Sequence, residues 1–415
     1  MSTHPPVPRT TSRTGTRVGV GWSENANSRQ AGAEAASAAL QRAGLSRCTL
    51  ALIFATSKHD PVAFHAGARS VLGSGARVVG GYSVGIITND FLGYEGYQCG
   101  VAVFDLPTDC FELFIEHGLD GGEHAVGVRL GEQIRQARFT GDPSLIVLYD
   151  AVREKTATAM SLNMATPLLE GMTESLETWP AVAGVGMFGD LQVNPTYQWF
   201  DDAMHQQAAM TLALHNGVRM HTTIMHGCKP SSTYHTITKA DGPVVLEIDG
   251  KPALQAVADM LGPGADRGWE EYPLFVTLGV NKGEKFGEFR EDHYANRMCM
   301  AVDQERQALV MFEPDLKEGD EVQLMRRSLD FDYVRRRTQD MLDSLEDREP
   351  FFALYIDCAG RAAPYCGTEE EEAAEVQKAI GDIPLLGMYS GVEIAKVAGQ
   401  VQALDWTGVL CVFTK

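Results

Sequence analysis

Short apolar runs separated by polar, glycine-containing turns dominate this chain. The run Phe351–Ile356 is too short for a helix and rich in aromatic residues, so it predicts a strand. Thr368, with Glu371 three residues later, has the spacing of a capping box and predicts a helix start. Pro384 breaks the apolar stripe of that helix, and Leu385–Tyr389 predicts a second strand. The whole segment therefore reads as strand, turn, helix, strand.

The same pattern occurs earlier in the chain. The apolar run Ala51–Thr56 leads to a helical stretch and then to Val78–Ile87, in which Tyr82-Ser83 aligns with Tyr389-Ser390. A weaker third copy comprises Leu145–Asp150, Gly184–Asp190 and Met210–Leu214. An internal repeat constrains a fold more than a single motif does. We therefore predict an α/β fold of tandem pseudo-symmetric strand-helix-strand units with mixed sheets, packed as two halves.

The domain organisation follows from length and local composition. The chain has 415 residues, enough for two domains. Residues 1–16 are polar and rich in Pro, Ser and Thr, without the apolar core of a secretion signal, and predict a disordered tail. We expect one domain over residues 17–217 and a second over residues 218–415.

The composition limits which binding partners and which cellular compartment we expect. A net charge of −20 argues against a nucleic-acid-binding protein. No apolar run approaches the length of a membrane span, so we expect no membrane partner. The eight cysteines are scattered without zinc-type spacing, and with no secretion signal they favour the reducing cytoplasm.

Polar groups follow the repeated strands, where loops carry function more often than cores do. Arg361 is a planar two-pronged donor that could bind a carboxylate, and Glu393 could hold an amine. The two strand ends are expected to face each other across a cleft between the repeat halves, a place where small ligands bind. The candidate ligand-binding residues are Tyr82, Ser83, Gly85, Thr88, Asn89, Asp90, Cys358, Gly360, Arg361, Tyr389, Ser390 and Glu393.

Two other chemistries compete with ligand binding. Cys358 lies beside Arg361 in a turn and could act as a thiolate nucleophile, with His59 from the equivalent loop of the first repeat as its base. Heme could bind noncovalently through His59, His65 or His226, because no Cys-x-x-Cys-His attachment motif is present. A scaffold without a ligand also fits the pattern. We expect a binding protein without a cofactor rather than an enzyme.

Several stretches together resemble the FIST family (F-box and intracellular signal transduction proteins). They are ALIFATSKHDP from Ala51, VVGGYSVGIITND from Val78, the segment from Gly189, HGCKPSSTYHTITKADGPVVLEIDGKPAL from His226, NRMCMAVDQERQALVMFEPDLKEGDEVQLMRR from Asn296, and YIDCAGRAAPYCG from Tyr355 with IPLLGMYSGVEI from Ile383. The resemblance covers nearly everything after the first ~40 residues.

The resemblance implies a sensory module that binds small ligands, with amino acids proposed for the family and heme-based nitric oxide sensing in some members. No kinase, cyclase or F-box segment accompanies the two FIST regions, so we expect a separate signalling protein as the output partner. Thr88-Asn89-Asp90 and Gly93–Tyr97 stand where many members have a Gly-Glu pair after the Ser-x-Gly turn. The later repeat keeps its acid, Glu393.

Overall fold

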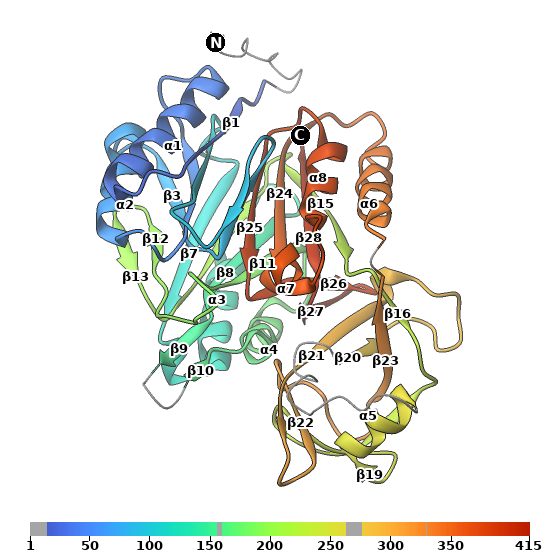
Figure 1. Ribbon diagram of the computed structural model, residues 1–415. Helices are drawn as coiled ribbons and strands as arrows, with labels where there is room; N and C mark the ends of the chain where they lie inside the picture. Colours follow the sequence, from blue (N-terminus) through green and yellow to red (C-terminus); the bar gives the residue numbers. More distant parts are fainter. Residues whose placement is uncertain (1–14, 156–159, 263–275, 329) are drawn as a thin grey trace.

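A computed structural model describes residues 15–155, 160–262, 276–328 and 330–415 of the chain (Figure 1). Three mixed sheets, each covered on its outer face by helices, pack together, and a β-barrel is inserted in the third. The predicted mixed α/β fold is confirmed. The predicted division into two packed halves is not, because the strand order separates the body into three units.

The first sheet has the order β1-β6-β2-β3-β12-β13. Strand β2 runs parallel to β3 and antiparallel to β6. Its elements are β1 (Val18–Ser23), α1 (Ser28–Ala43), β2 (Leu50–Ala55), α2 (Pro61–Leu72), β3 (Arg77–Tyr82), β6 (Cys99–Phe104), β12 (Gln198–Phe200) and β13 (Ala203–His205).

The second sheet repeats that arrangement in the order β7-β14-β8-β11-β26-β27. Strand β8 is parallel to β11 and antiparallel to β14. The elements are β7 (Phe111–His117), a 3₁₀ turn (Leu119–Gly121), α3 (Glu123–Gln136), β8 (Ser144–Asp150), the small hairpin β9 (Val152–Lys155) and β10 (Met160–Leu162), α4 (Ala165–Leu176), β11 (Ala181–Met187), β14 (Ala208–Leu214), β26 (Val392–Val397) and β27 (Gln400–Leu404).

The third sheet has the corresponding order β15-β28-β24-β25-β4-β5. Strand β24 is parallel to β25 and antiparallel to β28. The elements are β15 (Arg219–Met225), α6 (Asp332–Asp343), β24 (Pro350–Cys358), a 3₁₀ turn (Ala359–Arg361), α7 (Ala363–Cys366), α8 (Glu372–Ile380), β25 (Leu385–Ser390), β28 (Gly408–Thr414), β4 (Gly85–Thr88) and β5 (Leu92–Tyr94).

Each sheet is completed by a hairpin that belongs to another unit. After β3 the chain leaves the first sheet, and β4 pairs with β25 of the third. After β25 the chain leaves the third sheet, and β26 pairs with β11 of the second. After β11 the chain leaves the second sheet, and β12 pairs with β3 of the first. The three units are therefore joined in a closed ring of exchanged hairpins.

The alternation of side chains along the central strands explains how the sheets pack. In β2, Leu50, Leu52 and Phe54 join a core shared by all three sheets, which also contains Ile146 of β8 and Phe352 of β24. The intervening residues of β2 face helices α1 and α2. Because both faces are covered, β2, β8, β14 and β28 are buried at every position. This is why these strands read as continuous apolar runs in the sequence.

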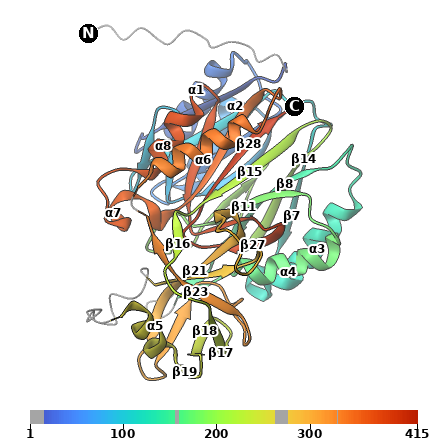
Figure 2. The ribbon, with the colours of Figure 1, turned by 90° about the vertical axis from the view of Figure 1, so that its right-hand side faces the viewer.

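A barrel separates β15 from α6 in the third unit. Among the described residues its strands follow the order β23-β17-β18-β22-β21-β20, and a β23–β20 pairing closes it. Figures 1 and 2 place it at one end of the body, next to α4 and β27. Its elements are β16 (Cys228–Pro230), β17 (His235–Asp241), β18 (Val244–Ile248), β19 (Lys251–Pro252), α5 (Ala253–Leu261), β20 (Thr277–Asn281), a 3₁₀ turn (Glu291–His293), β21 (Tyr294–Asp303), β22 (Ala308–Met311) and β23 (Glu321–Arg327).

The predicted strands of the repeat lie at equivalent places in their sheets. The runs at 351–356 and 385–389 fall in β24 and β25, and those at 145–150, 184–190 and 210–214 correspond to β8, β11 and β14. The predicted boundary after residue 217 lies between β14 and β15. Of the predicted tail, residues 1–14 lie outside the described residues. None of the helices in the described part of the chain is long and apolar enough to cross a membrane.

Candidate functional site

Arg361 lies at the carboxyl end of β24 and is buried in a cluster of polar side chains. Its Nε donates to Asp357 Oδ1 at 2.8 Å. Its Nη2 lies 2.6 Å from Glu372 Oε1 and donates to Tyr333 Oη at 3.1 Å. Its Nη1 donates to the carbonyl of Trp406 at 3.2 Å. We call Tyr333, Asp357, Arg361 and Glu372 the Arg361 cluster.

The Arg361 cluster joins four separate parts of the chain. Asp357 lies near the end of β24, and Arg361 lies in the 3₁₀ turn that follows. Glu372 begins α8, and Tyr333 belongs to α6. Glu372 also accepts a hydrogen bond from Arg327 of barrel strand β23 at 3.2 Å. The same Arg327 guanidinium lies 4.6 Å from the ring centroid of Trp406. The cluster thus connects the third sheet, its two helices and the barrel.

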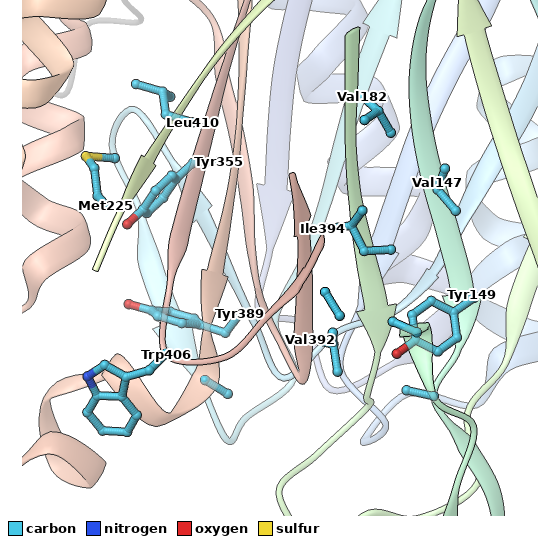
Figure 3. Close-up of a cluster of buried hydrophobic side chains, with 14 of the residues drawn as sticks. Val147, Tyr149, Val182, Met225, Tyr355, Tyr389, Val392, Ile394, Trp406 and Leu410 are labelled. Carbon is cyan, nitrogen blue, oxygen red and sulfur yellow. The ribbon is translucent and has the colours of Figure 1, made fainter. Parts of the chain in front are cut away.

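Not every polar atom of this region has a partner. Asp357 Oδ2 and Tyr355 Oη are buried without a hydrogen bond of normal geometry. Burial raises the pKa of Asp357 to about 7, against the opposing charge of Arg361. Figure 3 shows the hydroxyls of Tyr355 and Tyr389 pointing to the same side, where Trp406 lies. Buried polar groups are nearly always satisfied, so unsatisfied ones mark a place for water or a ligand.

Other candidate residues surround the cluster. Glu393 accepts a hydrogen bond from Ser390 Oγ at 2.7 Å, and burial raises its pKa well above the ordinary range. Cys358 is buried beside it. A side chain at Gly360 would come within 2.8 Å of the Trp406 ring. The structure therefore brings together six of the predicted residues, namely Cys358, Gly360, Arg361, Tyr389, Ser390 and Glu393.

The predicted capping box is wrong. Helix α8 starts at Glu372 rather than after Thr368, and Glu371 holds the cap position without a side-chain cap bond. The Glu371 carboxylate is instead used across the junction between units: it accepts from Tyr94 Oη at 2.6 Å and from Tyr389 Oη at 3.1 Å. Burial first, and then Glu371, raise the pKa of Tyr94 above its ordinary value.

The first repeat reaches the same end of the third sheet. The Val84 amide donates to the Tyr389 carbonyl at 3.0 Å, which places the turn after β3 next to the end of β25. Ser83 Oγ donates to the Gly85 carbonyl at 3.1 Å, and Tyr82 Oη donates to the His59 carbonyl. All three predicted residues here, Tyr82, Ser83 and Gly85, are buried. The two strand ends thus adjoin through this backbone hydrogen bond, and the ligand-binding cleft expected between them stays a prediction.

Thr88, Asn89 and Asp90 lie elsewhere. Strand β4 runs antiparallel to β25, so Thr88 pairs with Leu386 near the start of β25. Asn89 Nδ2 donates to the Ile383 carbonyl at 2.8 Å, and Asp90 forms an ion pair with Arg42 at 2.7 Å. These three residues are therefore separated from the Arg361 cluster, and their contacts hold the turn between α8 and β25 against α1.

The three candidate heme ligands already form hydrogen bonds, and they lie in different parts of the fold. The Nε2 atoms of His59, His65 and His226 lie 3.0, 2.8 and 3.0 Å from the carbonyls of Tyr97, Asp201 and Glu291 respectively. An axial bond through Nε2 would have to break these contacts. His59 and His65 belong to the first unit, whereas His226 follows β15. In the described parts of the chain, no group of three or more His, Cys, Asp or Glu side chains could hold a metal ion.

The geometry does not favour Cys358 as a nucleophile. Burial raises its thiol pKa well above the model-peptide value, so the thiol stays protonated at neutral pH. The His59 ring contacts Ser28 and Tyr97 in the first unit, and burial lowers its pKa.

We expect one rapidly reacting thiol in the native protein. Seven of the eight cysteines are buried, and Cys366 is half-buried in α7. About one equivalent of thiol in the native protein should therefore react quickly with a thiol reagent. Cys366→Ser should abolish this fast phase of the reaction. Fast labelling of Cys358, mapped by peptide mass spectrometry, would contradict this expectation and restore the enzyme hypothesis.

Sequence reasoning missed a second buried cluster, where the barrel meets the body. Arg297 of β21 donates to Asp315 Oδ1 at 2.6 Å and to the Ala403 carbonyl at 3.0 Å. Asp405 Oδ2 accepts from the Met298 amide at 2.8 Å. Glu313 accepts from the amides of Ala165 and Thr166, which begin α4, at 3.1 and 2.9 Å. No local pattern marks these residues, because their burial arises only when the barrel docks.

The fold and the buried polar clusters together define the class of protein. This is a mixed α/β protein of three hairpin-exchanging units with an inserted barrel, and its buried charged groups gather at strand ends. The FIST N domain matches residues 49–251, and the FIST C domain matches residues 253–396. The chain therefore belongs to the FIST family, and the two matches meet at β19, inside the barrel region.

Three similar proteins are each described as uncharacterised. An uncharacterised protein of Mycobacterium tuberculosis is 23% identical over 198 residues, covering 48% of this chain and 51% of its own length. One of Mycobacterium bovis is 23% identical over 201 residues, with the same shares. One of Methanocaldococcus jannaschii is 26% identical over 151 residues, which is 33% of this chain and 27% of that protein. The chain spans about half the length of the mycobacterial relatives it matches.

Proposed function

We propose that this chain is a sensory protein that binds a small, amino-acid-like ligand at the Arg361 cluster and acts on a separate signalling partner. FIST domains belong to sensory signalling, which supports the general role. The observation that carries the location is the buried pair Asp357 and Tyr355 beside Arg361, whose Oδ2 and Oη atoms form no hydrogen bond of normal geometry. A ligand ammonium would satisfy Asp357, and a ligand carboxylate would pair with Arg361.

Ligand binding would require an exchange of partners. Arg361 is already paired with Asp357 and Glu372, and all three are nearly inaccessible. The ligand carboxylate would take the place of Glu372 on the guanidinium. Because Glu372 lies in the first turn of α8, its release would shift that helix relative to the barrel, where Arg327 also holds it. The displaced helix would form the signal read by the partner.

Entry to the site would pass between two units. The segment that carries Arg361 and α7 is fastened to the exchanged hairpin of the first unit by Tyr94 on Glu371 and by Tyr365 on Glu95. Both tyrosine hydroxyls donate to carboxylates at the protein surface or near it. Opening these contacts exposes the Arg361 cluster without unfolding a strand. The cleft between repeat units predicted from the sequence would then exist in the open form.

Thermal unfolding with a panel of the common amino acids and their amides tests this proposal. A ligand at a hundred times its Kd stabilises the native state by about 2.7 kcal/mol, which a melting experiment resolves. Arg361→Lys keeps the charge but loses the planar fork, so it should abolish the ligand-induced rise in Tm. Arg335→Lys, on the exposed face of α6, is the matched control and should retain the rise.

Two results would contradict the proposal. An unchanged ligand-induced shift in Arg361→Lys would show that the guanidinium does not contact the ligand. No shift with any panel member, together with no small molecule released when freshly purified protein is denatured and analysed by mass spectrometry, would remove the ligand-binding role.

A further inference from the structure

A second, open site lies where the barrel meets the body. A cleft of about 390 Å³ is enclosed by α4, by β27 and by barrel segments that follow β20 and β22. This volume lies in the range of sites for small metabolites. Figure 1 shows α4 and β27 bordering the barrel on this side. The residues used below are Leu169, Glu170, Lys282, Asp315, Lys317 and Val401.

The walls of the cleft are fixed from behind. Arg297 holds Asp315 on the barrel side and the carbonyl of Ala403 on the β27 side. Glu313 fixes the first turn of α4 to the barrel by accepting two of its amide hydrogens. Three elements distant in sequence are thus held in place around one hollow. The Arg361 cluster shares no residue with its lining.

The charged side chains that line the cleft differ in how strongly they are paired. Asp315 is taken by the two-pronged contact with Arg297, and the Arg297 charge holds its pKa below the ordinary value despite burial. Lys317 lies 3.7 Å from Glu170, and both side chains are more than half exposed, so this pair is weak. Lys282 forms no direct ion pair with a carboxylate of the described residues, although its charge also helps to lower the pKa of Asp315. Within the described part of the chain, Lys282 is therefore without a close ion-pair partner, and Lys317 is easily released from Glu170.

Part of the lining of the cleft is apolar. Leu169 of α4 is buried, and Val401 and Ala403 of β27 line the opposite part. A ligand that suits both features has one anionic group and a short hydrocarbon chain. A doubly charged anion suits it less, because Glu170 and Asp320 also border the opening.

We infer that this cleft binds a short aliphatic monocarboxylate, with its carboxylate on Lys282 and Lys317 and its chain against Leu169 and Val401. A bound molecule contacts α4, β27 and the barrel together. Binding therefore holds the barrel against the body, and amide hydrogens at the start of α4 exchange more slowly with solvent. This site is independent of the ligand site proposed at the Arg361 cluster.

Sodium butyrate is the probe, titrated into the whole chain at constant ionic strength and followed by calorimetry. We expect saturable binding that Lys282→Gln weakens about tenfold or more, as loss of a charged hydrogen-bond donor to a carboxylate does. Lys285→Gln is the matched control three residues further on, since Lys285 pairs with Glu321 outside the cleft. Butyrate should also slow amide exchange at Ala165 and Thr166.

Each contrary result overturns the inference. Failure of butyrate to saturate, equal affinity in Lys282→Gln, or stronger binding of butylamine than of butyrate would each show that the cleft does not select a carboxylate. Loss of butyrate binding in Arg361→Lys would place butyrate at the Arg361 cluster instead. An amino-acid response that disappears in Arg361→Lys while butyrate binding persists would show two separate sites.

Discussion

Replacing Arg361 by alanine is expected to lower the free energy of unfolding by about 3–5 kcal/mol, because the substitution leaves Asp357 without its counter-charge and Glu372 with Arg327 alone. Asp357 and Glu372 are each about 1% exposed, and Arg361 contacts both within 2.8 Å. Neither carboxylate can reach water without movement of β24 or α8. Urea denaturation followed by circular dichroism measures the effect.

The control for Arg361→Ala is Arg335→Ala. Arg335 pairs with Asp332 at 2.7 Å, but both side chains are 54% exposed, so its loss should cost at most about 1 kcal/mol. Arg361→Lys should fall between the two, since the charge remains and the fork is lost. If Arg361→Ala cost no more than Arg335→Ala, water would have to reach the Arg361 cluster, contrary to the described burial.

The contribution of three buried acids to stability is expected to fall as pH rises from about 4 to about 7, opposite to the behaviour of most carboxylates. Burial raises the pKa of Asp357 and of Glu313 to about 7 and that of Asp405 to about 6, from ordinary values of 3.8, 4.5 and 3.8. The native state therefore keeps protons that the unfolded chain releases. Below the pKa values of the unfolded chain, both states are protonated and these acids make their full contribution to stability. That contribution is lost as pH rises through about 6 to about 7, the pKa values of the native state.

The expected slope is measurable. Each acid protonated only in the native state lowers the free energy of unfolding by about 1.4 kcal/mol per pH unit in that window. Urea denaturation at a series of pH values gives the slope directly. Glu313→Gln should reduce it, because the amide cannot ionise, whereas Asp259→Asn on the exposed face of α5 should leave it unchanged. If the pH dependence between about 4 and 7 were the same in Glu313→Gln as in the unsubstituted protein, the prediction would be contradicted.

Periodicity predicted the strands well because the sheets are covered on both faces. The continuous apolar runs of β2, β8 and β24 result from a shared core on one side and helices on the other. The repeat also indicated that the ends of β3 and β25 adjoin. What periodicity could not indicate was which sheet receives β4, because the exchange of hairpins depends on pairing between strands far apart in the sequence.

The dependence on long-range strand pairing also explains why only some of the predicted site residues lie together. Cys358 and Ser390 end the adjacent strands β24 and β25, whose parallel pairing brings Ser390 near the turn that carries Arg361. Glu393 lies near the start of β26 and is held there by Ser390. Thr88–Asp90 follow Gly85 closely in sequence, yet strand β4 already carries Thr88 about 10 Å from Gly85 at about 3.3 Å per residue. Tyr333 and Arg327 reach Glu372 only through the docking of α6 and the barrel, for which no sequence spacing is diagnostic.

The closed ring of exchanged hairpins has a consequence for how the protein is made. The hairpin β4–β5 leaves the ribosome long before its partner strand β25, and the place beside β11 stays empty until β26 is synthesised near the carboxyl end. Strand edges without partners are sites of misassociation in nascent chains. Native contacts between such distant segments form slowly. The first sheet therefore has all its strands once β13 is made, whereas the second and third sheets can be completed only together, after β25 to β28 are synthesised.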